Sequence, residues 1–266
     1  MLRTRLLAAA VLLPAAIAWA LWAPLMVYAG VAALFVLIGA WEWSGLAGLR
    51  LPVVRIIYLL LALVLMALGW LALSDNVIAG DLLWAFLLFW LLAALELARG
   101  PLSASRRGLA AQGFLVLVPA WFAMVAIRLR PEGAELVLAL LLIVWAADAG
   151  AYFAGKAWGL RRIAPALSPG KTWEGFAGGL AAAALAGAVT SLWCPVSPVV
   201  LIPLALTVTV FSLIGDLAES RLKRSAGAKD SGRLIPGHGG LLDRIDSLTA
   251  AAPVFALGLG LVGAAR

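Results

Sequence analysis

The sequence is poor in cysteine, histidine and charge, and these shortages exclude several classes of protein. It contains one cysteine, Cys194, and one histidine, His238. A single cysteine excludes an internal disulfide and a cysteine metal cluster. Only 12% of the 266 residues are charged, whereas 65% are hydrophobic. A soluble domain cannot hide this much apolar surface, so the bilayer is the natural solvent of the chain.

Long apolar runs dominate instead, and a membrane-spanning helix needs about 20 such residues. Spans are predicted at nine places, namely 6–22, 24–41, 53–73, 82–97, 109–127, 134–154, 175–194, 197–215 and 247–265. The start imitates a signal peptide, but the apolar pattern continues after it, as in a polytopic protein whose first span is its own signal. The sequence predicts an all-α, polytopic integral membrane protein with about nine transmembrane helices. Pro24 alone separates the first two, which predicts a tight helical hairpin.

The basic residues are distributed unevenly between the predicted loops. If the N-terminus is cytoplasmic, 17 of the 20 Lys and Arg residues lie on the cytoplasmic side of the membrane. The outer side then holds Arg128, Arg130 and Arg266. This asymmetry favours that orientation, and it explains the net charge of +7 without a nucleic-acid partner. We divide the chain into residues 1–130, with about five spans, and a catalytic transmembrane region, residues 131–266. The cytoplasmic loops 155–174 and 216–246 belong to the second part.

Carboxylates within or beside the predicted spans are the first functional candidates, because charge there is costly. Asp148 lies late in the sixth span, and Asp216 ends the eighth, with Glu219 one turn later on the same face. Asp243 and Asp246 repeat this spacing at the start of the ninth span. Such carboxylates suit Mg²⁺, which binds a few of them together with water and substrate phosphates. The alternative for Asp243 and Asp246 is capping of a helix N-terminus.

The loop 216–246 also collects cations and glycines. Lys223, Arg224 and Lys229 follow the acidic cluster, and guanidinium and ammonium groups bind phosphate. Positive-inside bias and lipid headgroups explain single cations, but the loop alternates acids and bases. His238 stands among glycines whose amides can approach an anion closely. It is therefore a candidate for donating a hydrogen bond to a phosphate, or for proton transfer.

The other polar loop, 155–174, contains the run Ser168-Pro169-Gly170-Lys171-Thr172-Trp173-Glu174. It resembles a helix start with Ser168 as the N-cap, and Lys171 then offers a second phosphate contact. The chain lacks a Walker phosphate loop and also HExxH, GxSxG and CxxC. The residues therefore favour magnesium-dependent phosphoryl or nucleotidyl transfer at a cytoplasm-facing site.

The stretch 220–246 resembles the signature of the phosphatidate cytidylyltransferase (CDP-diacylglycerol synthase) family. The positions that fit are Ser220, Lys223, Arg224, Lys229, Asp230, Gly232, Ile235, Pro236, His238, Gly239, Gly240, Asp243, Arg244 and Asp246. Residues 215–220, the 168–175 stretch, and Asp148 with its neighbours are similar to the family too. Glu42-Trp43 is a weak family-like pair in the first 130 residues, which otherwise match mainly as apolar spans.

The resemblance implies that CTP and phosphatidic acid react to give CDP-diacylglycerol and pyrophosphate. It also implies Mg²⁺, with K⁺ beside it in some members, and a homodimer. Metal binding is implied for Asp216, Asp243, Asp246 and Asp148, and catalysis by Lys223, Arg224, Lys229, Asp230, His238 and Arg244. Ser168, Lys171, Glu174, Ser220, Gly239 and Gly240 are the implied substrate-binding or bracing residues.

Two other functions stay open at this stage. A CTP-dependent polyprenol or phytol kinase shares the magnesium and the membrane but phosphorylates an alcohol, and the full signature argues against it. An ion-coupled transporter would use Asp148 and Asp216 as ion sites, but it predicts polar residues along a path through both leaflets. The Ala-, Leu- and Trp-rich composition suggests a bacterial gene, and so the inner membrane.

Overall fold

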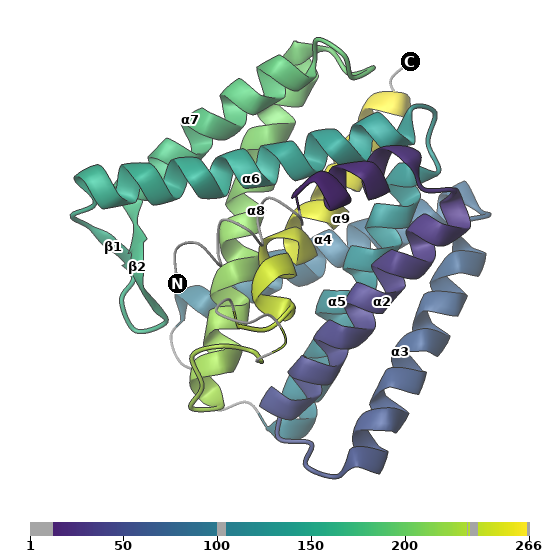
Figure 1. The fold of residues 1–266 in the computed structure, drawn as a ribbon, viewed down its shortest axis with the longest axis vertical. Coiled ribbons are helices and arrows are strands. Elements are labelled where there is room, and N and C mark those ends of the chain that lie inside the picture. Colours follow the sequence, from purple (N-terminus) through teal and green to yellow (C-terminus); the bar gives the residue numbers. More distant parts are fainter. Residues whose placement is uncertain (1–12, 100–104, 233, 235–238, 265–266) are drawn as a thin grey trace.

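The computed structural model describes residues 13–99, 105–232, 234 and 239–264, and this part of the chain is predominantly helical (Figure 1). A short helix, Leu13–Trp22, comes first. The elements that follow are α2 (Leu25–Leu46), α3 (Pro52–Ala72), α4 (Asn76–Ala98), α5 (Arg106–Arg128), α6 (Gly133–Trp158), β1 (Arg162–Ala164), β2 (Ser168–Thr172), α7 (Trp173–Thr190), α8 (Pro198–Ser225) and α9 (Leu242–Ala264). The predicted all-α class is confirmed, with one two-stranded hairpin added to it.

Seven of the described helices, α2 to α6, α8 and α9, are long and apolar enough to cross a membrane. In α3 and α4 only 17% and 11% of the apolar window is buried, so leucines cover their outer faces. Such surfaces are stable only against lipid, and the chain is an integral membrane protein. The predicted spans 6–22 and 175–194 are not among the seven. The first is described only from Leu13, and the second corresponds to the 18-residue, glycine- and alanine-rich α7.

The predicted hairpin of the first two helices is confirmed. The first helix ends at Trp22, and α2 begins at Leu25, immediately after Pro24. Proline fits the residue before a helix, because its φ is fixed and it has no amide hydrogen to satisfy. The rings of Trp19 and Tyr28 stack across the turn with centroids 4.3 Å apart. The first helix therefore packs back against α2.

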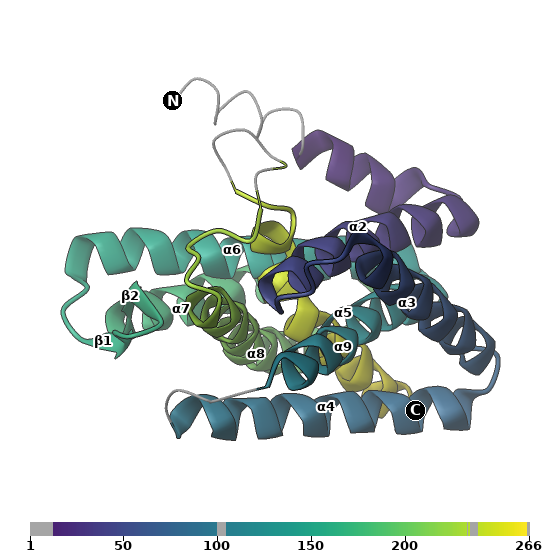
Figure 2. The same cartoon turned by 90° about the horizontal axis from the view of Figure 1, so that it is seen from below.

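Helices α6 and α7 pack at very short range and position one wall of the site. A Cβ atom on Gly150 would lie 2.5 Å from Cβ of Ala182 and 2.7 Å from the carbonyl oxygen of Gly178. Small residues at a membrane helix interface allow the two backbones to approach, and dispersion contacts then hold them. In the chain between α6 and α7, β1 and β2 form an antiparallel hairpin, which lies beside the end of α6 in both views (Figure 1 and Figure 2).

The structure corrects the interpretation of the 155–174 loop. Helix α6 continues to Trp158, and Ser168 is the first residue of β2 rather than a helix N-cap. The N-cap of α7 is Thr172, whose backbone is extended and whose hydroxyl accepts a 3.1 Å hydrogen bond from the Gly175 amide. A β-branched threonine suits both the strand and the cap. The N-cap predicted at Ser168 is therefore four residues too early.

Helix α8 is also longer than predicted, because it continues past Asp216 to Ser225. At 1.5 Å per residue, Asp216 lies about 14 Å from that end of the helix. Helix α9 starts beside Asp216 and not beside Ser225, since a Cβ on Gly215 would lie 2.6 Å from the carbonyl oxygen of Asp246. The connection between α8 and α9 therefore folds back into the protein, where non-helical backbone is tolerated if protein surrounds it.

Candidate active site

Four carboxylates and one lysine line a cavity of about 370 Å³ between α6, β2, α7, α8 and α9. They are Asp148 from α6, Lys171 from β2, Asp216 from α8, and Asp243 and Asp246 from the first turns of α9. The cavity also has apolar walls, including Tyr152, Ile163, Phe176 and Leu213. The structure thus brings together all four residues predicted to bind metal, together with the lysine predicted to bind substrate.

Lys171 joins the hairpin to α8. Its ammonium forms an ion pair with Asp216, and both side chains are about three-quarters buried. Asp216 also accepts a long hydrogen bond, 3.4 Å, from the hydroxyl of Ser220 one turn later. The two polar segments singled out in the sequence, 155–174 and 216–246, therefore meet at this ion pair.

Lys223 is held by acids on two sides and is itself buried. Its ammonium lies 2.6 Å from Oδ1 of Asp243 and 3.3 Å from Oε1 of Glu219, one turn earlier on α8. Glu219 is 2% exposed. A charge removed from water needs such compensation, because its desolvation costs several kcal/mol. In this structure Lys223 fixes the start of α9 to α8.

Asp243 organises the glycine turn before α9. Its second oxygen, Oδ2, accepts hydrogen bonds from the Gly240 amide at 2.8 Å and from the amide and hydroxyl of Ser231 at 3.0 and 2.9 Å. Gly239 has a φ of 83°, and a Cβ there would lie 2.6 Å from this same oxygen. The glycines thus let the backbone approach an anion, as predicted, but this anion is a protein carboxylate. Asp243 therefore ties the turn to the start of α9, and the amides from which it accepts, those of Gly240 and Ser231, precede that helix.

Glu42 supports the site from outside the cavity. In the sequence it stood out only as part of the weak family-like pair Glu42-Trp43. It comes from α2, is 8% exposed, and accepts hydrogen bonds from the amides of Leu241 at 3.0 Å and Leu242 at 2.8 Å. Its Oε2 also lies 2.9 Å from the Ser231 hydroxyl, whose single proton is shared between Glu42 and Asp243. A carboxylate at the first amides of a helix is favoured by both hydrogen bonding and the helix dipole. An acid within an apolar span is a functional candidate, because charge there is costly. The predicted second span ends at residue 41, so Glu42 lay just outside it and was not selected.

Glu174 braces the turn after α6. Its carboxylate accepts hydrogen bonds from the amides of Leu160 and Arg161 and pairs with the Arg161 guanidinium, all at 3.1 Å. Together with its own amide, these donors lower the pKa of Glu174 to about 2. Of the two roles implied for Glu174, contact with substrate or bracing, the geometry is that of a brace.

The remaining predicted residues lie around the cavity and not in its wall. Arg224 is exposed and donates to the carbonyl oxygens of Leu167 and Ala228, so it joins the hairpin to the α8–α9 connection. Lys229, Asp230 and Arg244 are exposed. His238 lies outside the described residues.

The donor set fits a hard divalent cation in chemistry but is not a preformed cage. Carboxylate oxygens are the ligands that Mg²⁺ prefers, and four carboxylates share this cavity. Within the described residues, however, no three of the acidic, histidine or cysteine side chains come close enough to hold one ion together. Asp243 accepts from Lys223, Gly240 and Ser231, whereas Asp216 accepts from Lys171 and, at 3.4 Å, from Ser220. Asp216 has fewer protein donors to give up, so we prefer it, with Asp148 and Asp246, as a ligand.

Comparison with known proteins agrees with this geometry. The model of the cytidylyltransferase family matches residues 3–262. A phosphatidate cytidylyltransferase of Pseudomonas aeruginosa is 42% identical over 272 residues, covering 99% of this chain and 98% of its own. One of Haemophilus influenzae is 39% identical, covering 96% and 97%, and one of Bacillus subtilis is 40% identical over about half of each chain. The chain belongs to the cytidylyltransferase family.

Proposed function

We propose that this protein is a phosphatidate cytidylyltransferase, which transfers CMP from CTP to phosphatidic acid and releases pyrophosphate. The observation that carries the proposal is the cavity in which Lys171 and the carboxylates meet, about 14 Å along α8 from its polar end. A lipid phosphate and a nucleotide need a polar site at such a depth. The full-length relatives that carry this name support the same reaction.

The reaction requires little acid–base chemistry from the protein. An oxygen of the lipid phosphate forms a bond to the α-phosphorus of CTP, and the bond from that phosphorus to the bridging oxygen of the β-phosphate breaks. A phosphate monoester is largely ionised at pH 7 and needs no strong base to attack. The barrier lies in bringing two anions together, which fixed positive charge lowers. Lys171, at the cavity wall, is the residue we assign to this task.

The other cations take different roles. Lys223 is enclosed by Asp243 and Glu219, so we assign it to holding α9 in place and not to a phosphate. Arg224 holds the turn of the hairpin beside the α8–α9 connection. Exposed Lys229, together with His238, is assigned to the polyphosphate of CTP on the strength of the family signature.

Asp148, Asp216 and Asp246 would hold Mg²⁺. The ion would neutralise phosphate oxygens and orient the leaving pyrophosphate when bound. Lys171, paired with Asp216, would face the substrate phosphates at the same cavity wall. The excess of carboxylates over lysines at the cavity supports this assignment.

We further propose a cytoplasmic N-terminus, a cytoplasm-facing site in a bacterial inner membrane, and a homodimer. The asymmetry of Lys and Arg supports the orientation. CTP is a soluble nucleotide, which requires the cavity to open on the side that holds it.

The test is a turnover assay with purified protein in mixed micelles of detergent and phosphatidic acid. Labelled CTP is supplied with and without Mg²⁺ to the wild type, Asp216→Asn and Asp246→Asn. The control is Asp81→Asn, because Asp81 is an exposed acid in α4 outside the cavity. We expect magnesium-dependent CDP-diacylglycerol from the wild type and the control, and a higher magnesium requirement or no product from the other two.

Two results would contradict the proposal. Consumption of CTP with a polyprenol and not with phosphatidic acid would assign the protein to the kinases. Unchanged magnesium dependence in both aspartate variants would keep the reaction but remove these residues from the metal site.

A further inference from the structure

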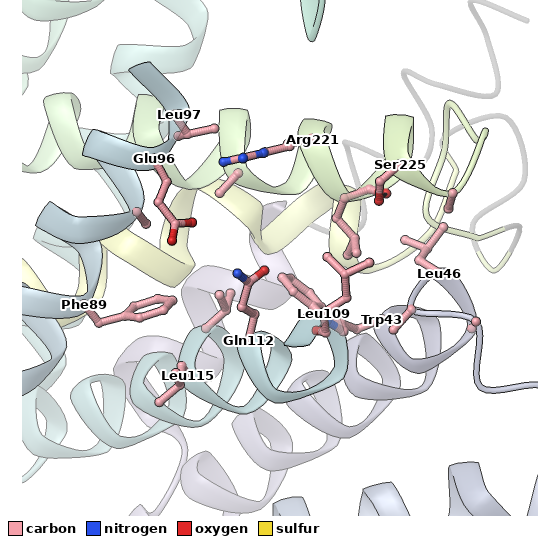
Figure 3. Close-up of a pocket in the computed structure, with 18 of the residues that line it drawn as sticks. Trp43, Leu46, Phe89, Glu96, Leu97, Leu109, Gln112, Leu115, Arg221 and Ser225 are labelled. Carbon is pink, nitrogen blue, oxygen red and sulfur yellow. Dashed lines mark hydrogen bonds between the residues drawn. The ribbon is translucent and has the colours of Figure 1, made fainter. Parts of the chain in front are cut away.

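A second and larger cavity, of about 810 Å³, lies on the opposite face of α8 (Figure 3). Residues 216, 219, 220 and 223 face the candidate active site side of that helix, whereas Ala218, Arg221, Leu222 and Ser225 line the second cavity. The other walls are the C-terminal ends of α2 and α4 and the N-terminal half of α5. Nothing in the proposed reaction uses this space.

The cavity is polar at one end and apolar at the other. Arg221 lies one turn before the end of α8, Glu96 two residues before the end of α4, and Gln112 in the second turn of α5. Phe89 and Val116 line it farther from these helix ends. Figure 3 shows Glu96 and Arg221 pointing toward one another across the space, with Phe89 and Leu115 farther along it. A headgroup at one end with chains at the other matches this order.

The cavity is open on two sides. Leu92 and Leu115, which line it, are 53% and 48% exposed, so an apolar opening faces the lipid beside α4. Arg50, in the connection after α2, is exposed at the polar end.

We propose that this cavity binds one diacyl phospholipid with a monoanionic phosphodiester headgroup, separately from the lipid that reacts. Of the described lining residues, the charged ones are Arg50, Arg221 and Glu96. Two guanidinium groups and one carboxylate leave a net charge of +1, which one phosphodiester neutralises. Guanidinium groups match phosphate oxygens in geometry as well as charge, and the acyl chains leave through the opening at Leu92 and Leu115.

The bound lipid would brace the elements that carry the candidate active site. Helix α8 presents Arg221 to the second cavity and Asp216 to the first. Trp43, fixed by a 2.7 Å hydrogen bond from its indole N–H to the Leu109 carbonyl, lines the second cavity, while its neighbour Glu42 holds the start of α9. A ligand that binds only the folded protein stabilises it by mass action, so occupancy is measurable without any assay of activity.

The test measures lipid binding directly. Purified protein in a neutral detergent is titrated with phosphatidylglycerol and, separately, with phosphatidic acid or phosphatidylcholine, and bound lipid is counted by native mass spectrometry. The variants are Arg221→Gln and Leu92→Trp. Their matched controls are Arg99→Gln, an exposed arginine at the end of α4, and Leu88→Trp, one turn from Leu92 with a similar exposure of 57%.

We expect one tightly held phosphatidylglycerol per chain and a rise in Tm on its addition. Loss of a charged hydrogen-bond partner weakens binding about tenfold or more, so Arg221→Gln should weaken binding and reduce the rise in Tm. Leu92→Trp should do the same because the indole fills the apolar opening, and the two controls should keep both effects. Equal retention by all variants would overturn the proposal, as would phosphatidic acid binding, beyond that at the candidate active site, that exceeds phosphatidylglycerol binding and is lost in Arg221→Gln. A changed oligomeric state in Leu92→Trp with phosphatidylglycerol binding intact would identify this face as a contact between copies instead.

Discussion

Replacing Glu42 by alanine should damage both stability and turnover, although Glu42 does not line the candidate active site. The carboxylate is 8% exposed and receives hydrogen bonds from Ser231, Leu241 and Leu242 at 2.8 to 3.0 Å. Without it, the two amides at the start of α9 are buried with no acceptor. Each such donor costs about 1–3 kcal/mol, so the loss is about 2–6 kcal/mol. This is a large part of the 5–15 kcal/mol that holds a typical protein folded.

Glu42→Gln provides a graded comparison, because its carbonyl oxygen still accepts while its NH₂ group opposes another donor. We expect its loss in Tm and in CTP turnover to lie between those of the wild type and Glu42→Ala. Asp81→Asn, an exposed acid in another helix, should leave both unchanged. Thermal unfolding in detergent and steady-state kinetics measure the two effects separately. If Glu42→Ala retains both the Tm and the turnover of the wild type, the connection to α9 does not depend on this carboxylate.

Three further changes test other contacts. Lys171→Met should lower turnover about 100-fold, as loss of one fixed electrostatic donor does, whereas exposed Lys156→Met should not. Gly240→Ala would place a Cβ 2.1 Å from the Ser231 hydroxyl and should lower Tm, whereas Gly30→Ala, with nothing within 4 Å, should be neutral. Glu174 stabilises the fold only while ionised, since its pKa falls from 4.5 to about 2. The Tm advantage of the wild type over Glu174→Gln should therefore be full above about pH 4.5 and disappear toward pH 2.

The sequence predicts the membrane helices well because apolar length is a direct physical requirement of the bilayer. It also predicts which carboxylates share a cavity. An acidic side chain within an apolar span is costly, so such residues are found mainly where they have a function. Asp148, Asp216, Asp243 and Asp246 come from three helices and still line one space.

The contacts between distant segments were beyond sequence reasoning. Ser168 has the side chain of an N-cap, but its pairing opposite Ala164 makes it part of a strand. Hydropathy falls where charge begins, so the predicted span ends at Asp216, whereas the helix continues for more than two turns. Glu42 can be recognised as a cap only when its partners, 199 and 200 residues later, are seen beside it.

That separation has a consequence for how the protein is made. Glu42 belongs to the second described helix, and its hydrogen-bond donors in α9 are synthesised 200 residues later. At about 5–20 residues per second, the ribosome needs about 10–40 s to reach them. During this interval an acid within α2 must remain in or beside the membrane without the amides that later satisfy it. The early helices therefore remain in an incomplete arrangement until α9 is made and its first amides reach Glu42.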